Sequence, residues 1–276
     1  MTDYETLNIS VGQHIAHVRF NRPEKANALN EMAWNELRDI FENLDSDEEV
    51  RSIILSGEGK HFCSGIDLSL LGSITKSDET CDARLREKLR KQILNLQSAV
   101  SSIEQCSKPV LAAISGGCIG AGLDIASACD MRYASDDAFF TIKEIDMGMV
   151  ADLGTLQRLP KLITDGIMRE MAFTGRKVFA QEAEKIGLIN QCFDNNESLI
   201  KAVFEIAATI ASKSPVSIRG TKHILNYSRD HSIADGLNYI ATWNAAMLLS
   251  EDLNEAFQAK KKKENPFFET RDEAKG

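Results

Sequence analysis

The chain has 276 residues, of which 43% are hydrophobic and 26% are charged, and its net charge is −9 at pH 7. This length allows a substantial buried core, while the acidic balance disfavours a general nucleic-acid-binding surface. No apolar run approaches the ~20 residues of a membrane-spanning helix. From the charge we expect no nucleic-acid partner, and from the short apolar runs no membrane partner.

The first half alternates strand and helix patterns. Leu7–Val11 and His14–Phe20 alternate apolar and polar residues, which predicts a hairpin. A helix with one apolar face is predicted from about Asn30, and Ser52–Ser56 is typical of a buried strand. Gly72–Cys81 is polar and indicates a surface loop.

Further strand and helix patterns follow this loop. Arg84–Cys106 predicts an amphipathic helix, and Val110–Ile114 a buried strand that leads into a glycine-rich turn. The remaining predictions are a helix at Leu123–Ala128, strands at Met131–Ala134 and Phe139–Ile142, and mostly helix from about Gln157 to Lys263. Strand–turn–helix units of this kind indicate an α/β fold with mainly parallel pairing.

Two glycine segments indicate backbone turns. Gly120-Ala121-Gly122 lacks the third glycine of a dinucleotide fingerprint, and Gly59-Lys60 lacks the other residues of a nucleotide P-loop. Phe62–Asp67 and Gly120–Gly122 can instead each aim a backbone N–H into a cavity, and two such groups at one point form an oxyanion hole. Close helix–strand packing is the alternative explanation for the glycines.

Three carboxylates follow the second turn. Asp124, Glu144 and Asp152 stand among glycines, small residues and apolar residues rather than in a charged run. An acid in such surroundings is costly to ionise unless it has a partner or a function, which suggests an acid/base site. For Asp152 a helix cap before Gly154-Thr155 is the alternative.

No metal or serine-nucleophile site is indicated. The five histidines are dispersed, without a pair at helical spacing, and no G-x-S-x-G elbow is present. The six cysteines form no C-x-x-C pair, which favours a reducing compartment. The acidic start lacks the features of a secretory or transit signal, and the ending DEAKG is not an SKL-type address, so we expect a bacterial cytoplasmic location.

Several motifs in order resemble the enoyl-CoA hydratase/isomerase, or crotonase, superfamily. They are NRPEKANALN (21–30), GKHFCSGIDL (59–68), KPVLAAISGGCIGAGLDIASACDMRYAS (108–135), AFTGRKVFAQEAEKIGLIN (172–190) and SEDLNEAFQAKKKKENPFF (250–268). The resemblance implies a spiral of β-β-α units in residues 1–200, which carry the active site. It also implies a helical region in residues 201–276 that assembles trimers, often paired into hexamers.

The resemblance also implies which residues hold the substrate, a coenzyme A thioester that needs no further cofactor. Its carbonyl oxygen would accept hydrogen bonds from the backbone N–H groups of Ile66 and Ala121; many relatives have Gly where this chain has Ala121. Lys25 and Ala26 resemble the strip that meets the adenine and pyrophosphate. The remaining residues implied to line the substrate are Ser64, Gly65, Asp67, Leu68 and Gly120.

The acids indicate which reaction of the superfamily to expect. Hydratases are expected to carry glutamates at the positions of Asp124 and Glu144 and a glycine at that of Asp152. The set in this chain is similar to dienoyl-CoA isomerases, which convert 3,5-dienoyl-CoA to 2,4-dienoyl-CoA in fatty-acid β-oxidation. That reaction moves a proton from C2 to the distant C6, a task for two acids in different protonation states.

We expect Glu144 and Asp152 to be the proton-transferring pair and Asp124 to line the pocket and tune them. The residues alone do not decide which of the pair acts at C2, although Asp152 is preferred. The alternatives are an enoyl-CoA hydratase, another enoyl-CoA isomerase of the superfamily, and a non-catalytic RNA-binding member.

Overall fold

A six-stranded sheet forms the centre of the structure, a computed structural model that describes residues 4–70 and 81–268. Its strands follow the order β1 (Leu7–Gly12), β2 (Ile15–Phe20), β3 (Ser52–Gly57), β4 (Val110–Ile114), β6 (Met131–Ser135) and β9 (Gln191–Phe193). Strands β1 and β2 form an antiparallel hairpin, and the other neighbours pair in parallel. The predicted hairpin and the predicted parallel pairing are therefore confirmed.

A second, three-stranded sheet carries the glycine-rich turn. It consists of β5 (Gly117–Ile119), β7 (Phe139–Thr141) and β8 (Val178–Phe179), in that order. Strand β5 was expected to be part of the turn, and β8 and β9 lie in the region predicted to be mostly helical. The prediction of mostly helix is therefore wrong at β8 and β9, because strands of two or three residues are too short to show an alternating pattern.

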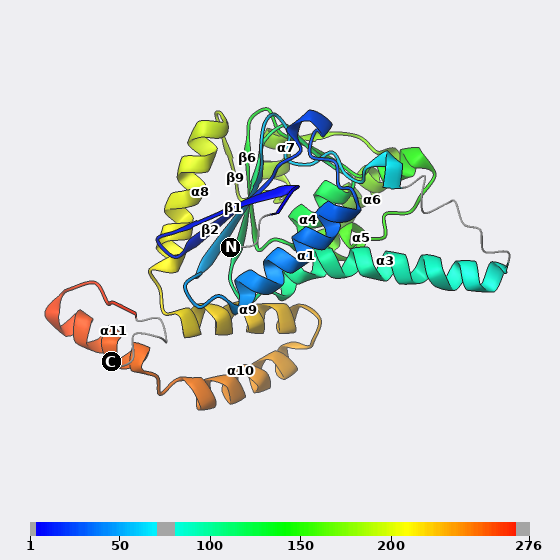
Figure 1. The fold of residues 1–276 in the computed structure, drawn as a ribbon. Helices are drawn as coiled ribbons and strands as arrows, with labels where there is room; N and C mark the ends of the chain where they lie inside the picture. The colour runs from blue at the N-terminus through cyan, green and yellow to red at the C-terminus, as the bar shows by residue number, and fades with distance from the viewer. Residues whose placement is uncertain (1–3, 71–80, 269–276) are drawn as a thin grey trace.

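Helices cover both faces of the large sheet (Figure 1). On one face lie α1 (Glu31–Ser46), α3 (Asp82–Gln105) and α4 (Ala121–Ala128), with α1 packed against α3 and α3 against α4. On the other face, α8 (Asn196–Ala211) contacts β3, β4, β6 and β9. Helix α1 begins where predicted, because the Asn30 side chain accepts a hydrogen bond from the Ala33 N–H and caps the first turn.

Short helices lie in the connections between strands. They are η1 (Pro23–Lys25), η2 (Glu144–Met147), α5 (Thr155–Arg158), η3 (Leu159–Lys161), α6 (Asp165–Thr174) and α7 (Ala180–Lys185). Two of the predicted acids belong to this region, since Glu144 begins η2 and Asp152 precedes α5.

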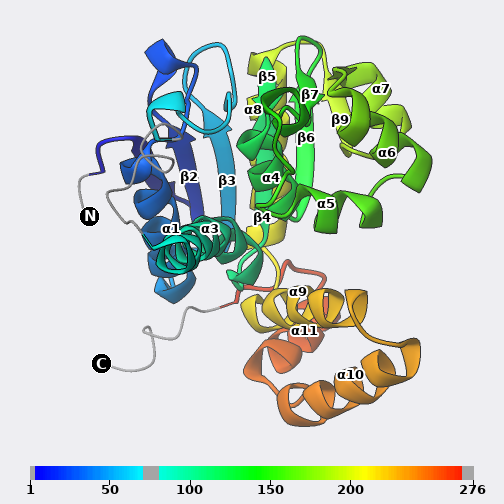
Figure 2. The same ribbon diagram turned by 90° about the vertical axis from the view of Figure 1, so that its right-hand side faces the viewer.

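The carboxyl-terminal helices lie beneath the core in Figure 2: α9 (Pro215–Arg229), α10 (Ile233–Met247) and α11 (Glu251–Lys262). They agree with the predicted helical carboxyl-terminal region. The predicted boundary at residue 200 falls inside α8, which packs on the sheet, so the division into two domains at that point stays a prediction.

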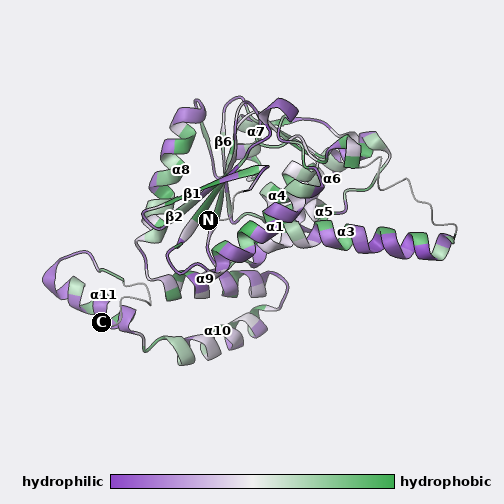
Figure 3. Cartoon of the chain, viewed as in Figure 1, coloured by the Kyte–Doolittle hydropathy of each residue, from purple (hydrophilic) through white to green (hydrophobic). Residues whose placement is uncertain are grey.

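Helix α3 extends away from the core, and Figure 3 shows that its projecting part is largely hydrophilic. Its buried residues are confined to the last two turns, from Ala99 to Ile103. The surface loop predicted at Gly72–Cys81 lies outside the described residues, apart from Cys81 itself. Among the helices that the structure describes, none is both long and apolar enough to cross a membrane.

Candidate functional site

The two glycine turns predicted from the sequence lie against each other. Residues Cys63 and Cys118 form a parallel bridge, which brings the segment 62–67 alongside β5. Gly65 has φ +96°, and a Cβ built on it would come within 2.9 Å of the Ile119 carbonyl and 3.5 Å of the Ala121 nitrogen. Glycine is therefore required here both by the backbone conformation and by this close approach.

The two candidate oxyanion donors are the backbone N–H groups of Ile66 and Ala121. Ala121 is the first residue of α4, so its N–H is one of those that have no hydrogen-bond acceptor within the helix. Neither N–H donates a hydrogen bond to any residue within 4–70 or 81–268. Both are thus available to an acceptor, and the helix dipole of α4 favours negative charge near the Ala121 N–H.

Glu144 lies beside the same turn. Its Oε1 atom is 3.0 Å from the position of a Cβ built on Gly120, the residue before Ala121. Gly120 has φ 52° and ψ −119°. Its N–H donates a hydrogen bond of 3.0 Å to the carbonyl of Thr141, which is three residues before Glu144, so the turn is joined to the segment that carries this acid. The Glu144 Oε2 atom is buried and has no hydrogen-bond partner among the described residues.

Asp124 projects from the first turn of α4 and is 1% exposed. Its Oδ1 atom accepts a hydrogen bond of 2.6 Å from the Thr155 N–H, at the start of α5. Its Oδ2 atom is buried without a partner in the described part of the chain. Unpartnered buried oxygens on both Asp124 and Glu144 are unusual, because such atoms normally find donors. They are open to a bound ligand or water.

Asp152 is the most accessible of the three acids. It lies in the loop before α5, where Gln97 of α3 donates a hydrogen bond of 2.6 Å to its carbonyl oxygen. Gly154, not Asp152, occupies the cap position of α5, and the carboxylate that receives the Thr155 N–H is that of Asp124. The alternative explanation of Asp152 as a helix cap is therefore wrong.

Burial raises the pKa of all three acids, and repulsion from neighbouring carboxylates adds to the rise for Asp124 and Glu144. Burial raises the pKa of Asp124 to about 7, and the charges of Glu144 and Asp152 add to the rise. Burial likewise raises the pKa of Glu144, with a contribution from Asp152, and partial desolvation raises that of Asp152. Carboxyl groups coupled in this way readily hold different protonation states near neutral pH, as acid/base chemistry requires.

The strip predicted to meet coenzyme A adjoins the Gly65 turn. The Ser64 N–H donates to the Ala26 carbonyl at 3.0 Å, and the Ser64 hydroxyl lies 3.4 Å from the Lys25 carbonyl. Ala26 is left-handed, with φ 49°, and the Lys25 side chain is exposed. Lys25, Ala26, Ser64 and Gly65 thus form one continuous edge beside the candidate oxyanion donors.

Two residues that the sequence did not single out hold this edge together. Asn27 is 1% exposed, accepts from the Arg22 N–H, and donates to the carbonyls of Glu58 and His61. Arg22 forms an ion pair of 3.1 Å with Asp67. Asp67 was predicted to line the substrate, which stays a prediction; its carboxylate bonds Ser69 and Arg22, and these bonds hold its pKa below the ordinary value.

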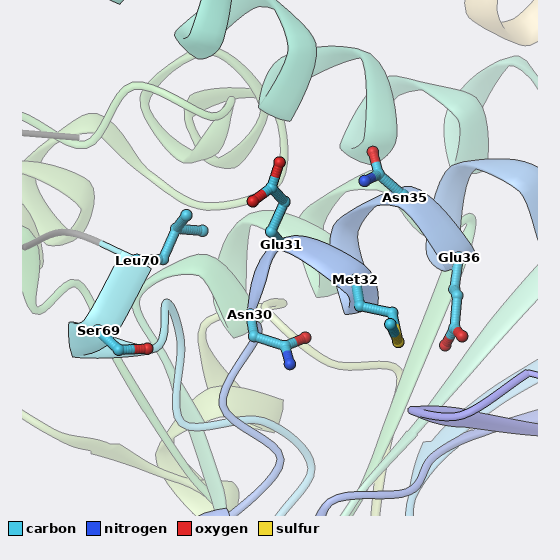
Figure 4. Close-up of a pocket in the computed structure, with 7 residues that line it drawn as sticks. All are labelled: Asn30, Glu31, Met32, Asn35, Glu36, Ser69 and Leu70. Carbon is cyan, nitrogen blue, oxygen red and sulfur yellow. The ribbon is translucent and has the colours of Figure 1, made fainter. Parts of the chain in front are cut away.

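A pocket of about 560 Å³ lies next to this edge, between the first turn of α1 and residues 69–70 (Figure 4). Its lining residues are Asn30, Glu31, Met32, Asn35, Glu36, Ser69 and Leu70. None of the three acids lines the pocket. Leu68, which is 67% exposed, is the residue before the lining residue Ser69. This pocket is therefore separate from the acids.

A metal site is not evident in the described ranges, where no three His, Cys, Asp or Glu side chains are grouped to hold an ion. The candidate site thus consists of two backbone donors and three acids.

Comparisons with known proteins agree on one family. Residues 10–271 match a family model described as enoyl-CoA hydratase/isomerase. The chain is 46% identical over 260 residues to the mitochondrial Delta(3,5)-Delta(2,4)-dienoyl-CoA isomerase of Mus musculus, covering 93% of this chain and 80% of that protein. It is also 46% identical over 273 residues to the peroxisomal enzyme of that name from Arabidopsis thaliana, and the match covers 97% of this chain and 98% of that protein.

Solved structures give the same result. An enoyl-CoA hydratase from Bacillus anthracis superposes with a TM-score of 0.88 at 28% identity, covering 97% of this chain and all of that one. A putative enoyl-CoA hydratase from Streptomyces coelicolor A3(2) has the same TM-score at 29% identity, and the superposition covers 98% of this chain and 96% of that one.

Proposed function

Because the chain belongs to the enoyl-CoA hydratase/isomerase family, we propose that it isomerises 3,5-dienoyl-CoA to 2,4-dienoyl-CoA in fatty-acid β-oxidation. The family resemblance and the α/β spiral with carboxyl-terminal helices, both predicted from the sequence, are confirmed. The observation that carries the proposal is the trio Asp124, Glu144 and Asp152: burial raises the pKa of each, and the charges of Glu144 and Asp152 reach Asp124 and raise its pKa further.

In the proposed mechanism, the thioester carbonyl oxygen accepts hydrogen bonds from the N–H groups of Ile66 and Ala121. Loss of the C2 proton then moves negative charge onto that oxygen and forms an extended enolate. Fixed donors aimed at the developing charge lower the barrier without reorganisation, typically by about 3–4 kcal/mol for each donor.

Two carboxyl groups would transfer the protons. An ionised carboxylate takes the proton from C2, and the electron pair spreads along the conjugated chain. A protonated carboxyl group returns a proton at C6, which leaves double bonds at C2 and C4. We assign these roles to Glu144 and Asp152, while Asp124, tied to the Thr155 N–H, tunes their pKa values.

The substrate's nucleotide portion would lie along the edge formed by Lys25, Ala26, Ser64 and Gly65, with Leu68 and Gly120 beside the acyl group. The Lys25 ammonium is exposed and supplies a positive charge for a phosphate. Asp67 would lie beside the substrate at this edge, held there by its ion pair with Arg22.

The test is ultraviolet absorbance of purified protein mixed with 3,5-dienoyl-CoA. Conjugation of the new diene with the thioester carbonyl should produce a strong absorbance rise. No rise, together with efficient hydration of a 2-enoyl-CoA, would identify a hydratase instead.

We also propose self-association as trimers or hexamers through the carboxyl-terminal helices. Ile233 and Leu249 there are 84% and 93% exposed in the single chain, and large exposed apolar side chains favour an interface. Light scattering of the purified protein measures the assembly. A cytoplasmic location remains the proposal from the sequence, although the relatives are named mitochondrial or peroxisomal, and microscopy of a tagged chain in its own cell tests it.

A further inference from the structure

Charged side chains connect the carboxyl-terminal helix α9 to the loop that carries Asp152. Arg229, the last residue of α9, forms an ion pair with Oε1 of Glu104 on α3. The other oxygen of the same carboxylate, Oε2, pairs with Arg158 of α5 at 3.0 Å. Glu104 thus bridges two arginines that come from different parts of the chain.

Arg158 in turn holds the Asp152 loop. Its Nη1 atom donates to the Leu153 carbonyl at 3.3 Å, and its guanidinium covers Gly154 so closely that any side chain at position 154 would overlap it. Gly154 has φ +128°, a conformation that residues with a Cβ rarely adopt. The loop conformation just after Asp152 is therefore shaped by the Arg158 side chain.

The bridge is partly shielded from water. The side chains of Arg158, Glu104 and Arg229 are 12%, 19% and 33% exposed. Burial opposes ionisation of Glu104, but the hydrogen bonds and charges of the two arginines outweigh it and hold its pKa below the ordinary value. Charge-assisted bonds in such surroundings fix geometry better than exposed pairs do.

Helix α9 is anchored where Arg229 can reach Glu104. Lys222 pairs with Asp130 at 2.7 Å and donates to the Lys108 carbonyl at 2.9 Å. One turn later, Asn226 donates to the carbonyl of Glu104 itself at 3.2 Å. Lys222, Asn226 and Arg229 follow helical spacing, so one face of α9 contacts the end of α3.

Mostly polar side chains from α3, α5 and α9 border the loop on one side. A hollow of about 360 Å³ lies there, and Leu153 is the only hydrophobic side chain among its lining residues, which include Asp152, Gln97 and the three members of the bridge. Gln97 and Arg158 restrain this side of the loop through polar contacts, while Ala151 and Leu153 are buried in the core.

We propose that Glu104 and Arg229 are positioning residues for the reaction: through Arg158 they fix the loop that presents Asp152 to the substrate, so that the docking of α9 sets the geometry of proton transfer. This inference rests on the proposed function, since it takes Asp152 as one of the proton-transferring acids. Neither residue touches the substrate.

The experiment compares Arg229→Met with wild type and with Arg176→Met as a matched control. Arg176 is similarly exposed, at 28%, and also pairs with two carboxylates, Glu170 and Glu182; in the described part of the chain none of these three side chains bonds to residues 150–156. We measure kcat and KM with 3,5-dienoyl-CoA, and hydrogen–deuterium exchange of residues 150–156. Glu104→Gln is a second variant, which keeps the side-chain shape if Arg229→Met folds poorly.

We expect Arg229→Met and Glu104→Gln to lower kcat by about tenfold to a hundredfold, because small misplacements of a reacting group have such effects, with KM within about twofold. Exchange in 150–156 should become faster in both variants, and Arg176→Met should change neither quantity. Unchanged exchange in 150–156 overturns the inference, whatever happens to kcat. Because exchange needs no substrate, it still tests the bridge if the wild type does not isomerise dienoyl-CoA, a result that would refute the proposed function alone.

Discussion

The Asp124 carboxylate accepts a hydrogen bond of 2.6 Å from the backbone N–H of Thr155, 31 residues further along the chain. This bond joins α4, which carries a candidate oxyanion donor, to α5, which follows the Asp152 loop. It places a carboxyl group that is only 1% exposed at the junction of the two elements. The ionisation of Asp124 is therefore coupled to folding as well as to the site.

The first prediction concerns the pH dependence of stability. The pKa of Asp124 is raised by burial from 3.8 to about 7, so between these values the folded chain binds a proton that the unfolded chain has lost. Stability should fall as pH rises through this window, by up to about 4 kcal/mol from this site. Asp124→Asn keeps an oxygen for the Thr155 N–H but does not titrate, so its unfolding free energy should lack this fall.

Urea unfolding of both proteins from pH 4.5 to 7.5 measures the difference. Asp165→Asn on the surface of α6 is the control, because its exposed carboxylate pairs with the similarly exposed Arg169 of the same helix. A constant gap between Asp124→Asn and wild type across the range would show that Asp124 does not titrate there.

The second prediction concerns the proton-transferring pair. Asp152→Asn and Glu144→Gln each keep the side-chain size but remove a titrating group, so each should lower kcat by roughly 10²–10⁴-fold. KM should change little, because the proposed substrate contacts lie on the Lys25–Gly65 edge. The dienoyl-CoA absorbance assay measures both constants, and a variant with near-wild-type kcat would remove that residue from the proposed mechanism.

The sequence predicted most of the site because its chemistry is local in the chain. The glycine turns and the acids Asp124, Glu144 and Asp152 stand out by their neighbours, and amphipathic patterns located α1 and α3. Contacts between distant segments could not be predicted in this way. The Arg22–Asp67 ion pair, the buried Asn27 and the Asp124–Thr155 bond depend on how loops meet in space, which residue spacing does not encode.

The third prediction tests the backbone donor at position 121. Ala121 is the first residue of α4, where proline is tolerated because no helical partner is lost. Ala121→Pro removes the N–H and places the ring Cδ where the acceptor oxygen would lie, so kcat should fall by at least roughly 10²–10³-fold, the effect of losing one such donor. Ala121→Gly keeps the N–H and should keep kcat within about threefold of wild type, because its conformational cost of ~0.5–1 kcal/mol lowers folding stability and leaves the donor in place.

Thermal unfolding of both variants accompanies these assays. If Ala121→Pro unfolds near the wild-type temperature and remains fully active, the N–H of Ala121 is not an oxyanion donor. Equal losses in both variants would point to pocket shape at this position, not to hydrogen bonding.

The fourth prediction concerns His17, which is buried in β2 and takes no part in the site. Its Nε2 atom lies 2.8 Å from the Ser56 hydroxyl, and its ring meets Phe204 of α8 edge-on at 5.3 Å. Burial, helped by the charge of Arg19, lowers its pKa from 6.5 to about 4. Between these values the unfolded chain binds a proton that the folded chain does not.

Stability should therefore be lost as pH falls from 6.5 towards 4, by up to about 3 kcal/mol from His17, opposite in sign to the contribution of Asp124. His17→Gln should be less stable than wild type at pH 7.5, because it loses the ring contact with Phe204, but the gap should narrow at pH 4.5. Urea unfolding at both values measures the gap, and an NMR titration follows the imidazole directly. An imidazole of His17 that titrates near 6.5 in the folded protein would contradict the argument, since the packing of α8 against β2 would then not exclude the charged form.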